Sequence, residues 1–249
     1  EKLVAESALR HERMIATAAA EMKRMTPRAP DAPERWIVRA DRFDTLADID
    51  DADEVVLDID GVSDEEVRKV AAKFGKGRIR LALPIVTRSY ESAEIRRRIA
   101  SLTGMGFTRW LAANISAWEF LPQGCDIAVD WTLSAWNTPA IRELMARGAT
   151  GVTLSPECGV EELCGLAATW GDVAAVVLHQ DTPLMISESC PISALGAKCG
   201  ECPPKAEGRT SVALHAQRGD DVVATMRNCR TFITNMAPLS LARHVRALR

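Results

Sequence analysis

Aromatic residues and cysteines are scarce in this chain of 249 residues, which has six tryptophans, five phenylalanines, one tyrosine and seven cysteines. So few aromatic side chains give no indication of an extended surface on which nucleic-acid bases stack. Seven cysteines are also too few, in a chain of this length, for the disulfide framework of small secreted domains. With 47% hydrophobic residues, the chain can bury a large core as one domain, and its length fits a single barrel of about 250 residues.

Long apolar runs are absent as well. No window approaches the roughly 18 uncharged apolar residues that a membrane-spanning helix needs. Residues 1–25 are charged and helical in pattern, unlike a secretory signal peptide. We therefore expect a cytoplasmic protein that makes no membrane contact.

Several common catalytic and nucleotide-binding motifs are missing. The chain contains neither a Walker A motif nor G-x-G-x-x-G, which argues against a nucleotide-binding fold. It also contains neither the G-x-S-x-G of serine hydrolases nor the H-E-x-x-H of zinc peptidases. Any hydrolytic site would therefore have to be assembled from scattered residues.

Charge is unevenly distributed along the chain. Residues 203–249 hold eight Lys or Arg against three Asp or Glu, a net charge of +5, whereas residues 1–202 carry −8. Such a basic segment can bind RNA, another anionic surface, or the acidic remainder of its own molecule.

Short apolar runs alternate with helical patterns over most of the chain. Near-continuous apolar runs are typical of strands buried on both faces, as in a parallel sheet covered by helices. Seven such runs, most of them followed by a helical pattern, favour an α/β fold of the (β/α) TIM-type barrel over an open doubly wound sheet. No eighth strand is obvious, so we expect the barrel to be incomplete or distorted. The predicted strands span residues 36–40, 54–60, 78–86, 107–115, 125–133, 151–157 and 172–179, and the predicted helices span 63–74, 90–104, 138–148 and 160–170.

The chain divides into three predicted parts. Residues 1–33 form an N-terminal helix with one apolar face and a Pro-rich linker. Residues 34–186 form the barrel, and residues 187–249 form a small cysteine-rich, metal-binding C-terminal segment, in which residues 212–216 and 221–227 can pair as a hairpin. Because the chain begins inside a helical pattern and without Met, we expect it to be part of a longer protein.

Polar residues follow the predicted strands at the ends where barrel enzymes place their active sites. Asp130, Glu157 and His179 are the candidate catalytic residues, because two carboxyl groups and an imidazole can form an acid–base set. Polar residues at strand ends also cap helices, and Asp41 and Asn137 are expected to do so. The other candidates at strand ends are Arg39, Asp58, Asp60, Arg88, Asn114 and Ser155.

A loop-like stretch, SESCPISALGAKCGECPPK, holds three cysteines. Cys190 is followed by Cys199 after eight residues, by Cys202 after two more, and by Cys229 after a further 26. The C-x-x-C step lets two thiolates reach one metal from a single turn, and flanking cysteines complete tetrahedral sulfur coordination. Four thiolates suit an iron–sulfur cluster and zinc alike. The alternative is that they are small buried hydrophobic residues, which is the role expected of Cys125, Cys158 and Cys164.

Three segments resemble the peptidase U-32 family, also called the collagenase-like family. They are DWTLSAWNTPAIRELMARGATGVTLSPE (130–157), VVLHQDTPLMISESCPI (176–192) and CRTFITNMAPLSL (229–241). The chain is most similar to the barrel near the C-terminus of the long, two-part members. The resemblance implies a TIM-type barrel and a 4Fe-4S cluster, because members that act in RNA and ubiquinone hydroxylation hold such a cluster on four cysteines. The matching residues here are Cys190, Cys199, Cys202 and Cys229.

Three functions are compatible with these features. The leading expectation is an iron–sulfur protein that hydroxylates RNA or a similar substrate, with the N-terminal barrel of the same longer protein as partner. Its phosphate contacts would come from Arg209, Arg218, Arg227 and Arg230, although each can equally be a solvated surface residue. A peptidase would need an activated nucleophile or a metal-bound water, and four thiolates leave no open position for water. The third possibility is a non-catalytic docking or structural barrel.

Overall fold

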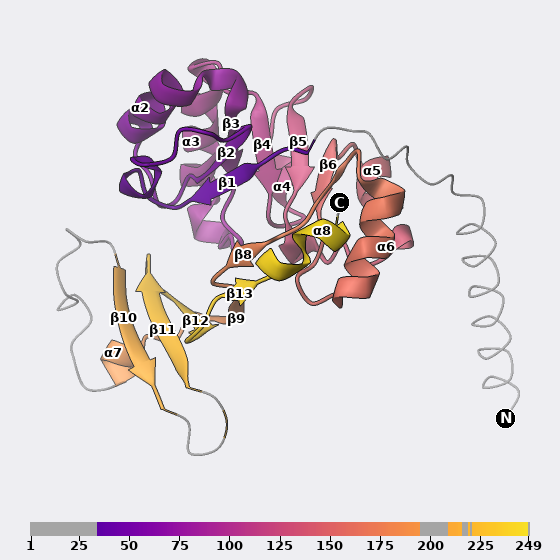
Figure 1. Ribbon diagram of the computed structural model, residues 1–249. Coiled ribbons are helices and arrows are strands. Elements are labelled where there is room, and N and C mark those ends of the chain that lie inside the picture. The colour runs from indigo at the N-terminus through magenta and orange to yellow at the C-terminus, as the bar shows by residue number, and fades with distance from the viewer. Residues whose placement is uncertain (1–33, 195–208, 216–218, 220, 249) are drawn as a thin grey trace, which may run out of the picture. The chain divides into compact units, whose positions relative to one another are not determined.

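The computed structural model describes residues 34–194, 209–215, 219 and 221–248. These residues form two compact units that divide between Val176 and Val177, with Ala247 and Leu248 belonging to the first unit. Figure 1 shows the elements of both units. The predicted N-terminal helix and linker lie outside the described residues.

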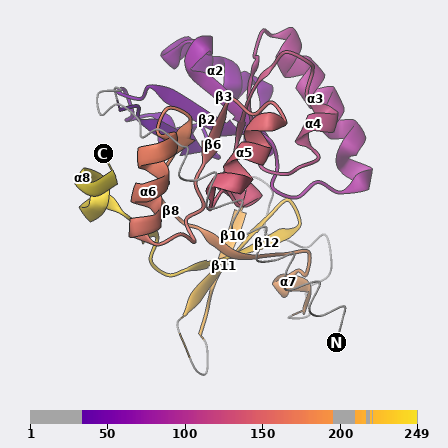
Figure 2. The ribbon, with the colours of Figure 1, turned by 90° about the vertical axis from the view of Figure 1, so that its right-hand side faces the viewer.

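The first unit is a mixed α/β structure built on one parallel sheet of seven strands, in the order β1-β2-β3-β4-β5-β6-β7. The sheet curls into a half-barrel (Figure 1 and Figure 2). Its edge strands are β1 and β7. Every strand falls inside a predicted strand, so the strand prediction is confirmed, although the strands are shorter than expected. The strands are β1 Ile37–Ala40, β2 Glu54–Asp58, β3 Ile79–Ala82, β4 Arg109–Ala112, β5 Asp126–Val129, β6 Gly151–Thr153 and β7 Ala174–Ala175.

The four predicted helices are confirmed, and local sequence explains where they begin and end. Ser63 caps α2 through a capping box, in which Glu66 N donates to Ser63 Oγ (3.2 Å) and Ser63 N donates to Glu66 Oε2 (2.6 Å). Gly75 ends α2 at φ 83°, a conformation that favours glycine. No helix among the described residues has the length and apolar character to cross a lipid bilayer. The helical elements are η1 Asp44–Leu46, α2 Asp64–Phe74, η2 Lys76–Arg78, η3 Ser89–Glu91, α3 Ser92–Gly104, α4 Ala117–Phe120, η4 Trp131–Leu133, α5 Thr138–Ala146 and α6 Val160–Trp170.

One side of the sheet packs against the helices and forms the hydrophobic core. Val55 and Leu57 of β2 are wholly buried there, in one cluster with Val67 of α2 and Leu102 of α3. Burial of each such side chain stabilises the fold by about 1.5–3 kcal/mol. Because side chains alternate along a strand, the intervening residues of β2 face the opposite, concave side of the half-barrel.

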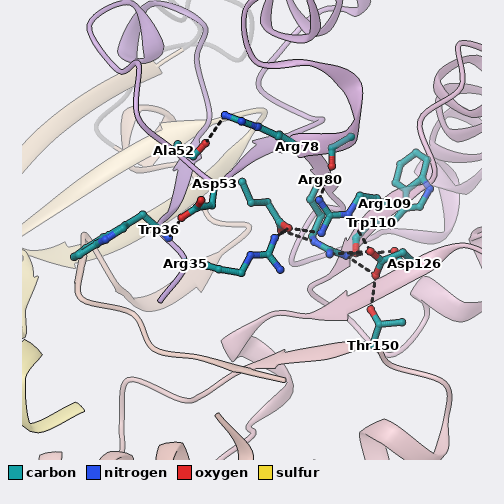
Figure 3. Close-up of polar contacts among 12 residues, drawn as sticks. Arg35, Trp36, Ala52, Asp53, Arg78, Arg80, Arg109, Trp110, Asp126 and Thr150 are labelled. Atoms are coloured by element: carbon teal, nitrogen blue, oxygen red, sulfur yellow. Dashed lines mark hydrogen bonds and ion pairs between the residues drawn. The ribbon is translucent and has the colours of Figure 1, made fainter. Parts of the chain in front are cut away.

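A buried charge network occupies the concave side at the amino ends of the strands (Figure 3). Arg80 of β3 donates from Nε to Glu54 of β2 at 2.6 Å and from its two Nη atoms to Asp126 of β5 at 3.0 and 3.1 Å. Arg109 of β4 binds the same two carboxylates, and Thr150 donates to Asp126. The side chains of Arg80 and Glu54 are only 7% and 5% exposed. We call this network the charge plug. Its two arginines and two carboxylates neutralise one another and fill the concave side at that end.

A second group of charges crosses the concave side near the carboxyl ends of the strands. Arg39 of β1 donates from Nη1 to Asp130, directly after β5, at 2.6 Å. Four strand spacings separate β1 from β5, which is about 19 Å in a flat sheet and far beyond the reach of one side chain. The contact can form only because the sheet curls, and it helps to hold the curl in turn.

The second unit contains two antiparallel sheets. Its larger sheet has the strand order β10-β11-β12-β9, and the predicted hairpin is confirmed as β10 and β11. The turn between β11 and β12 places Asn228 and Cys229 at positive φ, 51° and 56°, as in tight hairpin turns. The elements are β8 His179–Gln180, β9 Pro183–Ser187, α7 Pro191–Ala194, β10 Arg209–Leu214, β11 Val222–Arg227, β12 Arg230–Asn235, β13 Leu239–Ser240, η5 Ala242–His244 and α8 Val245–Leu248.

Two predictions about single residues are wrong. His179 does not end the seventh barrel strand, because β7 stops at Ala175 and His179 pairs with Ser240 of β13. The apolar run before His179 looked like one strand. In the structure it contains the end of β7, which pairs parallel with β6, and leads into β8, which pairs antiparallel with β13. Asp41 does not cap a helix, since η1 begins after Phe43, which makes no side-chain capping hydrogen bond.

Removal of one charge from the charge plug should destabilise the first unit strongly. Glu54→Gln leaves Arg80 and Arg109 with one carboxylate between them in a buried site, and we expect a loss of about 3–5 kcal/mol in the free energy of unfolding. Glu143→Gln is the matched control, because Glu143 pairs with Arg147 on the exposed side of α5, and it should cost less than about 0.5 kcal/mol. Urea denaturation of both variants tests this, and equal losses would contradict the assigned role.

Asp126 should make the fold sensitive to acid. Partial burial raises the pKa of Asp126, but hydrogen bonds from Arg80, Thr150 and Arg109 outweigh it, so this pKa lies well below its ordinary value. A lowered folded-state pKa contributes stability above the unfolded value of about 3.9, and this contribution is lost as the pH falls below it.

The pH dependence of thermal unfolding measures this contribution. Carboxylates become protonated between about pH 5 and pH 2. Over this range Asp126→Asn should lose less stability than the unaltered chain. Asp44→Asn removes the ion pair with Arg42 and should change the acid limb far less, because solvent screens an exposed pair. An unchanged acid limb in Asp126→Asn would contradict the prediction.

Candidate functional site

Asp130 lies at the carboxyl end of the half-barrel and belongs to a compact ion cluster. Arg39 Nη1 donates to Asp130 Oδ2 at 2.6 Å, and Arg39 Nε donates to Asp58 Oδ1 at 2.9 Å. The other oxygen of Asp130 accepts the backbone N–H of Trp131 at 2.9 Å. We call Arg39, Asp58 and Asp130 the rim cluster.

The rim cluster has a formal charge of −1, with one guanidinium held between two carboxylates. Burial lowers the pKa of Arg39, but Asp130 and Asp58 more than offset this effect, so the pKa lies above its ordinary value. Arg39 therefore stays charged at any pH at which the protein folds. The side chains of Asp130 and Asp58 are 2% and 12% exposed, against 28% for Arg39.

The three predicted catalytic residues divide between the two units, and no hydrogen bond joins Asp130 to Glu157 within the first unit. Glu157 follows β6, and its backbone N–H donates to Ser155 Oγ at 3.3 Å. Among the described residues, the side-chain hydrogen bonds of Asp130 go to Arg39 and Trp131. His179 belongs to the second unit. The acid–base set therefore stays a prediction. Of its three members, Asp130 is the one that the structure pairs with a charged side chain, Arg39.

Other polar residues at the strand ends have local structural partners. Asn137 caps α5 as predicted, by accepting the N–H of Ala140 at 2.9 Å. Asn114 Nδ2 donates to the carbonyl of Ile85 at 3.2 Å and thereby links the loops that follow β4 and β3. These contacts shape the rim around the cluster.

Two of the four predicted metal ligands converge in the second unit. Cys190 follows β9, and Cys229 forms part of the turn between β11 and β12. β9 and β12 pair in antiparallel register, with Ser187 opposite Thr231, and Thr231 Oγ1 donates to the carbonyl of Ser189 at 2.7 Å. This register places Cys190 and Cys229 at the same end of the same sheet, called here the cysteine end.

The other two predicted ligands, Cys199 and Cys202, lie outside the described residues. The flanking backbone is described on both sides. The chain leaves the cysteine end through α7 and re-enters the sheet at Arg209, which pairs with Arg227 next to the turn that contains Cys229. Among the described residues, no group of three or more His, Cys, Asp or Glu is placed to hold a metal ion.

Three of the four predicted RNA contacts also gather at the cysteine end. The backbone register places Arg209 opposite Arg227, and Arg227 opposite Arg230, across three neighbouring strands. The guanidinium of Arg227 lies 4.8 Å from the ring centre of Phe232, and Arg230 is 5% exposed. Arg218 lies outside the described residues.

Cys125, Cys158 and Cys164, predicted as buried core residues, are only partly buried, and Cys125 packs against the edge of the core. Burial raises the pKa of Cys125 and of Cys158, with smaller contributions from nearby carboxylates. A raised pKa keeps the thiol protonated and disfavours metal binding. Cys164 Sγ contacts the carbonyl of Ala247 at 3.2 Å.

Comparisons with protein-family models, with curated proteins and with solved structures found no match to this chain. Its function must therefore be inferred from its own residues and their arrangement.

Sequence reasoning missed the partners inside the half-barrel. Glu54, Arg80, Arg109 and Asp126 are all charged residues at the start of an apolar strand, and this repeated position was a usable indication. Tyr90 and Trp136, which are 75% and 50% exposed, were also missed because the composition shows so few aromatic residues.

Proposed function

We propose that this chain is an iron–sulfur protein of the peptidase U-32 type that takes part in the hydroxylation of RNA or a similar substrate. The observation that carries the proposal is the convergence of Cys190 and Cys229 at one end of the β9–β12 sheet. Their spacing and the sequence resemblance both predicted these two residues, far apart in the chain, as co-ligands, and the antiparallel register is compatible with this because both lie at the same end of the sheet.

The donor set fits the proposed centre. Thiolates are the usual ligands of a 4Fe-4S cluster, and Cys199 and Cys202 would supply the remaining two, with zinc as the alternative metal. When bound, a cluster supplies one-electron transfer. In this proposal the chain holds the centre on four thiolates. Cys190 and Cys229 lie at one end of the sheet, and Cys199 and Cys202 lie between α7 and β10 in the sequence.

The positive charge at the cysteine end supports an anionic substrate. The backbone register pairs Arg209 with Arg227 next to the turn that contains Cys229, and guanidinium groups bind phosphate in a bidentate manner. We propose that Arg209, Arg218, Arg227 and Arg230 contribute to RNA binding. Arg230 is buried, so its contribution is positive charge beneath the surface. In the same scheme the half-barrel is an incomplete TIM-type barrel that works beside an N-terminal barrel of the same longer protein, in the cytoplasm.

Iron, sulfide and zinc analysis of the full chain, purified without oxygen, tests the metal centre. We expect about four iron and four sulfide per chain and a broad absorption band near about 400 nm, as for a 4Fe-4S cluster. Cys190→Ser and Cys229→Ser should lose the cluster, whereas Cys158→Ser should retain it. Zinc alone would make the site structural, and an unaltered chain without metal would contradict the proposal.

RNA binding at several salt concentrations tests the anionic substrate. Arg227→Gln should weaken binding and reduce the salt slope by about 1 for each phosphate that Arg227 neutralises. Arg97→Gln is the control, because Arg97 is 75% exposed on α3 of the first unit. Equal effects of the two variants would show that binding is a general effect of net charge.

A further inference from the structure

The edge strands of the described sheets differ in how well they are protected against pairing with a further strand. An edge strand presents unpaired backbone N–H and C=O groups, and proteins shield it by shortness, charge, proline or a β-bulge. β1 has four residues and carries the charge of Arg39, and β7 has two residues. β9 begins at Pro183, and its register shifts against β12. Each of these edges therefore has a protecting feature.

β10 is an edge strand without such a feature. It has six residues, and among the described strands it pairs with β11 alone, in unbroken register (Figure 1). Its segment from Ser211 to Leu214 contains no charged residue, proline or glycine. All four residues are exposed, with Val212 at 36% and Leu214 at 38%. An edge of this kind is a template to which another strand can be added.

The turn between β11 and β12 shows which backbone groups of β11 bond to β10. Asn228 and Cys229, both at positive φ, form a two-residue turn, so the flanking residues Arg227 and Arg230 are a hydrogen-bonded pair. Both backbone groups of a residue point to one side of an antiparallel strand, and the side alternates along the chain. Every second residue of β11, counted back from Met226, therefore bonds to β10.

This alternation fixes the outward groups of β10. Ala224, two residues before Met226, lies opposite Val212, so Val212 bonds inward to β11. Its neighbours Ser211 and Ala213 therefore direct their N–H and C=O groups to the open edge. These are the groups that an added strand must pair with.

The outward groups of β10 match those of a second β10. When two such strands pair antiparallel about a two-fold axis at Val212, Ser211 of each copy lies opposite Ala213 of the other. Both residues point outward, so they form hydrogen-bonded pairs, as the alternation requires. Val212 and Leu214 also share the sheet face of the wholly buried Ala224, and pairing continues this apolar face from one copy into the other.

The same register is complementary in charge. It places Arg209 of each copy opposite His215 of the other, at the two ends of the paired strands. His215 Nδ1 lies 2.8 Å from Asp221 Oδ2, so each arginine meets a carboxylate of the other copy. A two-fold contact of this kind uses the same strand twice and closes after two chains.

We propose that β10 pairs with β10 of a second copy of this chain, in antiparallel register about Val212. The contact joins the two four-stranded sheets into one sheet across a symmetric dimer. It lies within the second unit and does not rest on the proposed metal centre or on RNA binding.

Sedimentation equilibrium of the full chain under reducing conditions, which prevent disulfides between copies, tests the dimer. We expect a monomer–dimer equilibrium with a dissociation constant of about 100 μM or tighter. Ala213→Pro removes an outward N–H but no bond to β11, and it should weaken association at least about tenfold. Leu184→Lys, at a residue of β9 that is 58% exposed, is the control and should dimerise as the unaltered chain does. Circular dichroism checks that each variant folds.

Charge reversal at Val212 tests the register. Val212→Lys and Val212→Glu should each weaken self-association at least about tenfold, because like charges lie opposite each other at the two-fold axis. An equimolar mixture of the two variants should form dimers, since opposite charges then meet. The proposal is overturned if the unaltered chain stays monomeric or assembles beyond dimers, if Ala213→Pro dimerises as strongly as the unaltered chain, or if the mixture stays monomeric.

Discussion

The contact between Arg39 and Asp130 joins the first strand of the parallel sheet to the fifth. In a flat sheet these strands lie too far apart for any side chain to span them, so the contact and the curl of the sheet require each other. The charge plug acts in the same way at the opposite end, because Arg80 and Arg109 each bridge β2 and β5. Curvature in this unit is thus held by ionic contacts across its concave side.

Between the two groups of charges lies a thin apolar layer, formed by Val56, Ala82 and Leu111 with the partly buried Ala128. The larger hydrophobic core is on the other side of the sheet, among the helices. The two sides of the sheet therefore have different roles. The helix-facing core and the charge plug stabilise the unit, while the carboxyl ends of the strands carry the rim cluster of Arg39, Asp58 and Asp130.

The second unit uses a different device to bring distant residues together. Antiparallel pairing of β9 with β12, and of β11 with its neighbours, aligns the end of one strand with the turn between two others. The backbones of Cys190, Cys229 and the neighbouring arginines lie at the same end of this sheet because of the strand register. The position of these residues depends on correct strand pairing, because a slip by one residue would turn each side chain to the opposite face.

Local patterns in the sequence determined the elements themselves. Apolar runs defined the seven parallel strands, and Ser63, Asn137 and Gly75 marked helix ends through their own capping and turn chemistry, which needs no distant partner. The +5 charge of the C-terminal segment and the spacing of its cysteines were also visible in the sequence. Only the tertiary structure decided which polar residues meet. It paired Arg39 with Asp130 across four strands and placed His179 in an antiparallel pair outside the parallel sheet, because such contacts depend on sheet curvature and strand pairing, which local sequence does not encode.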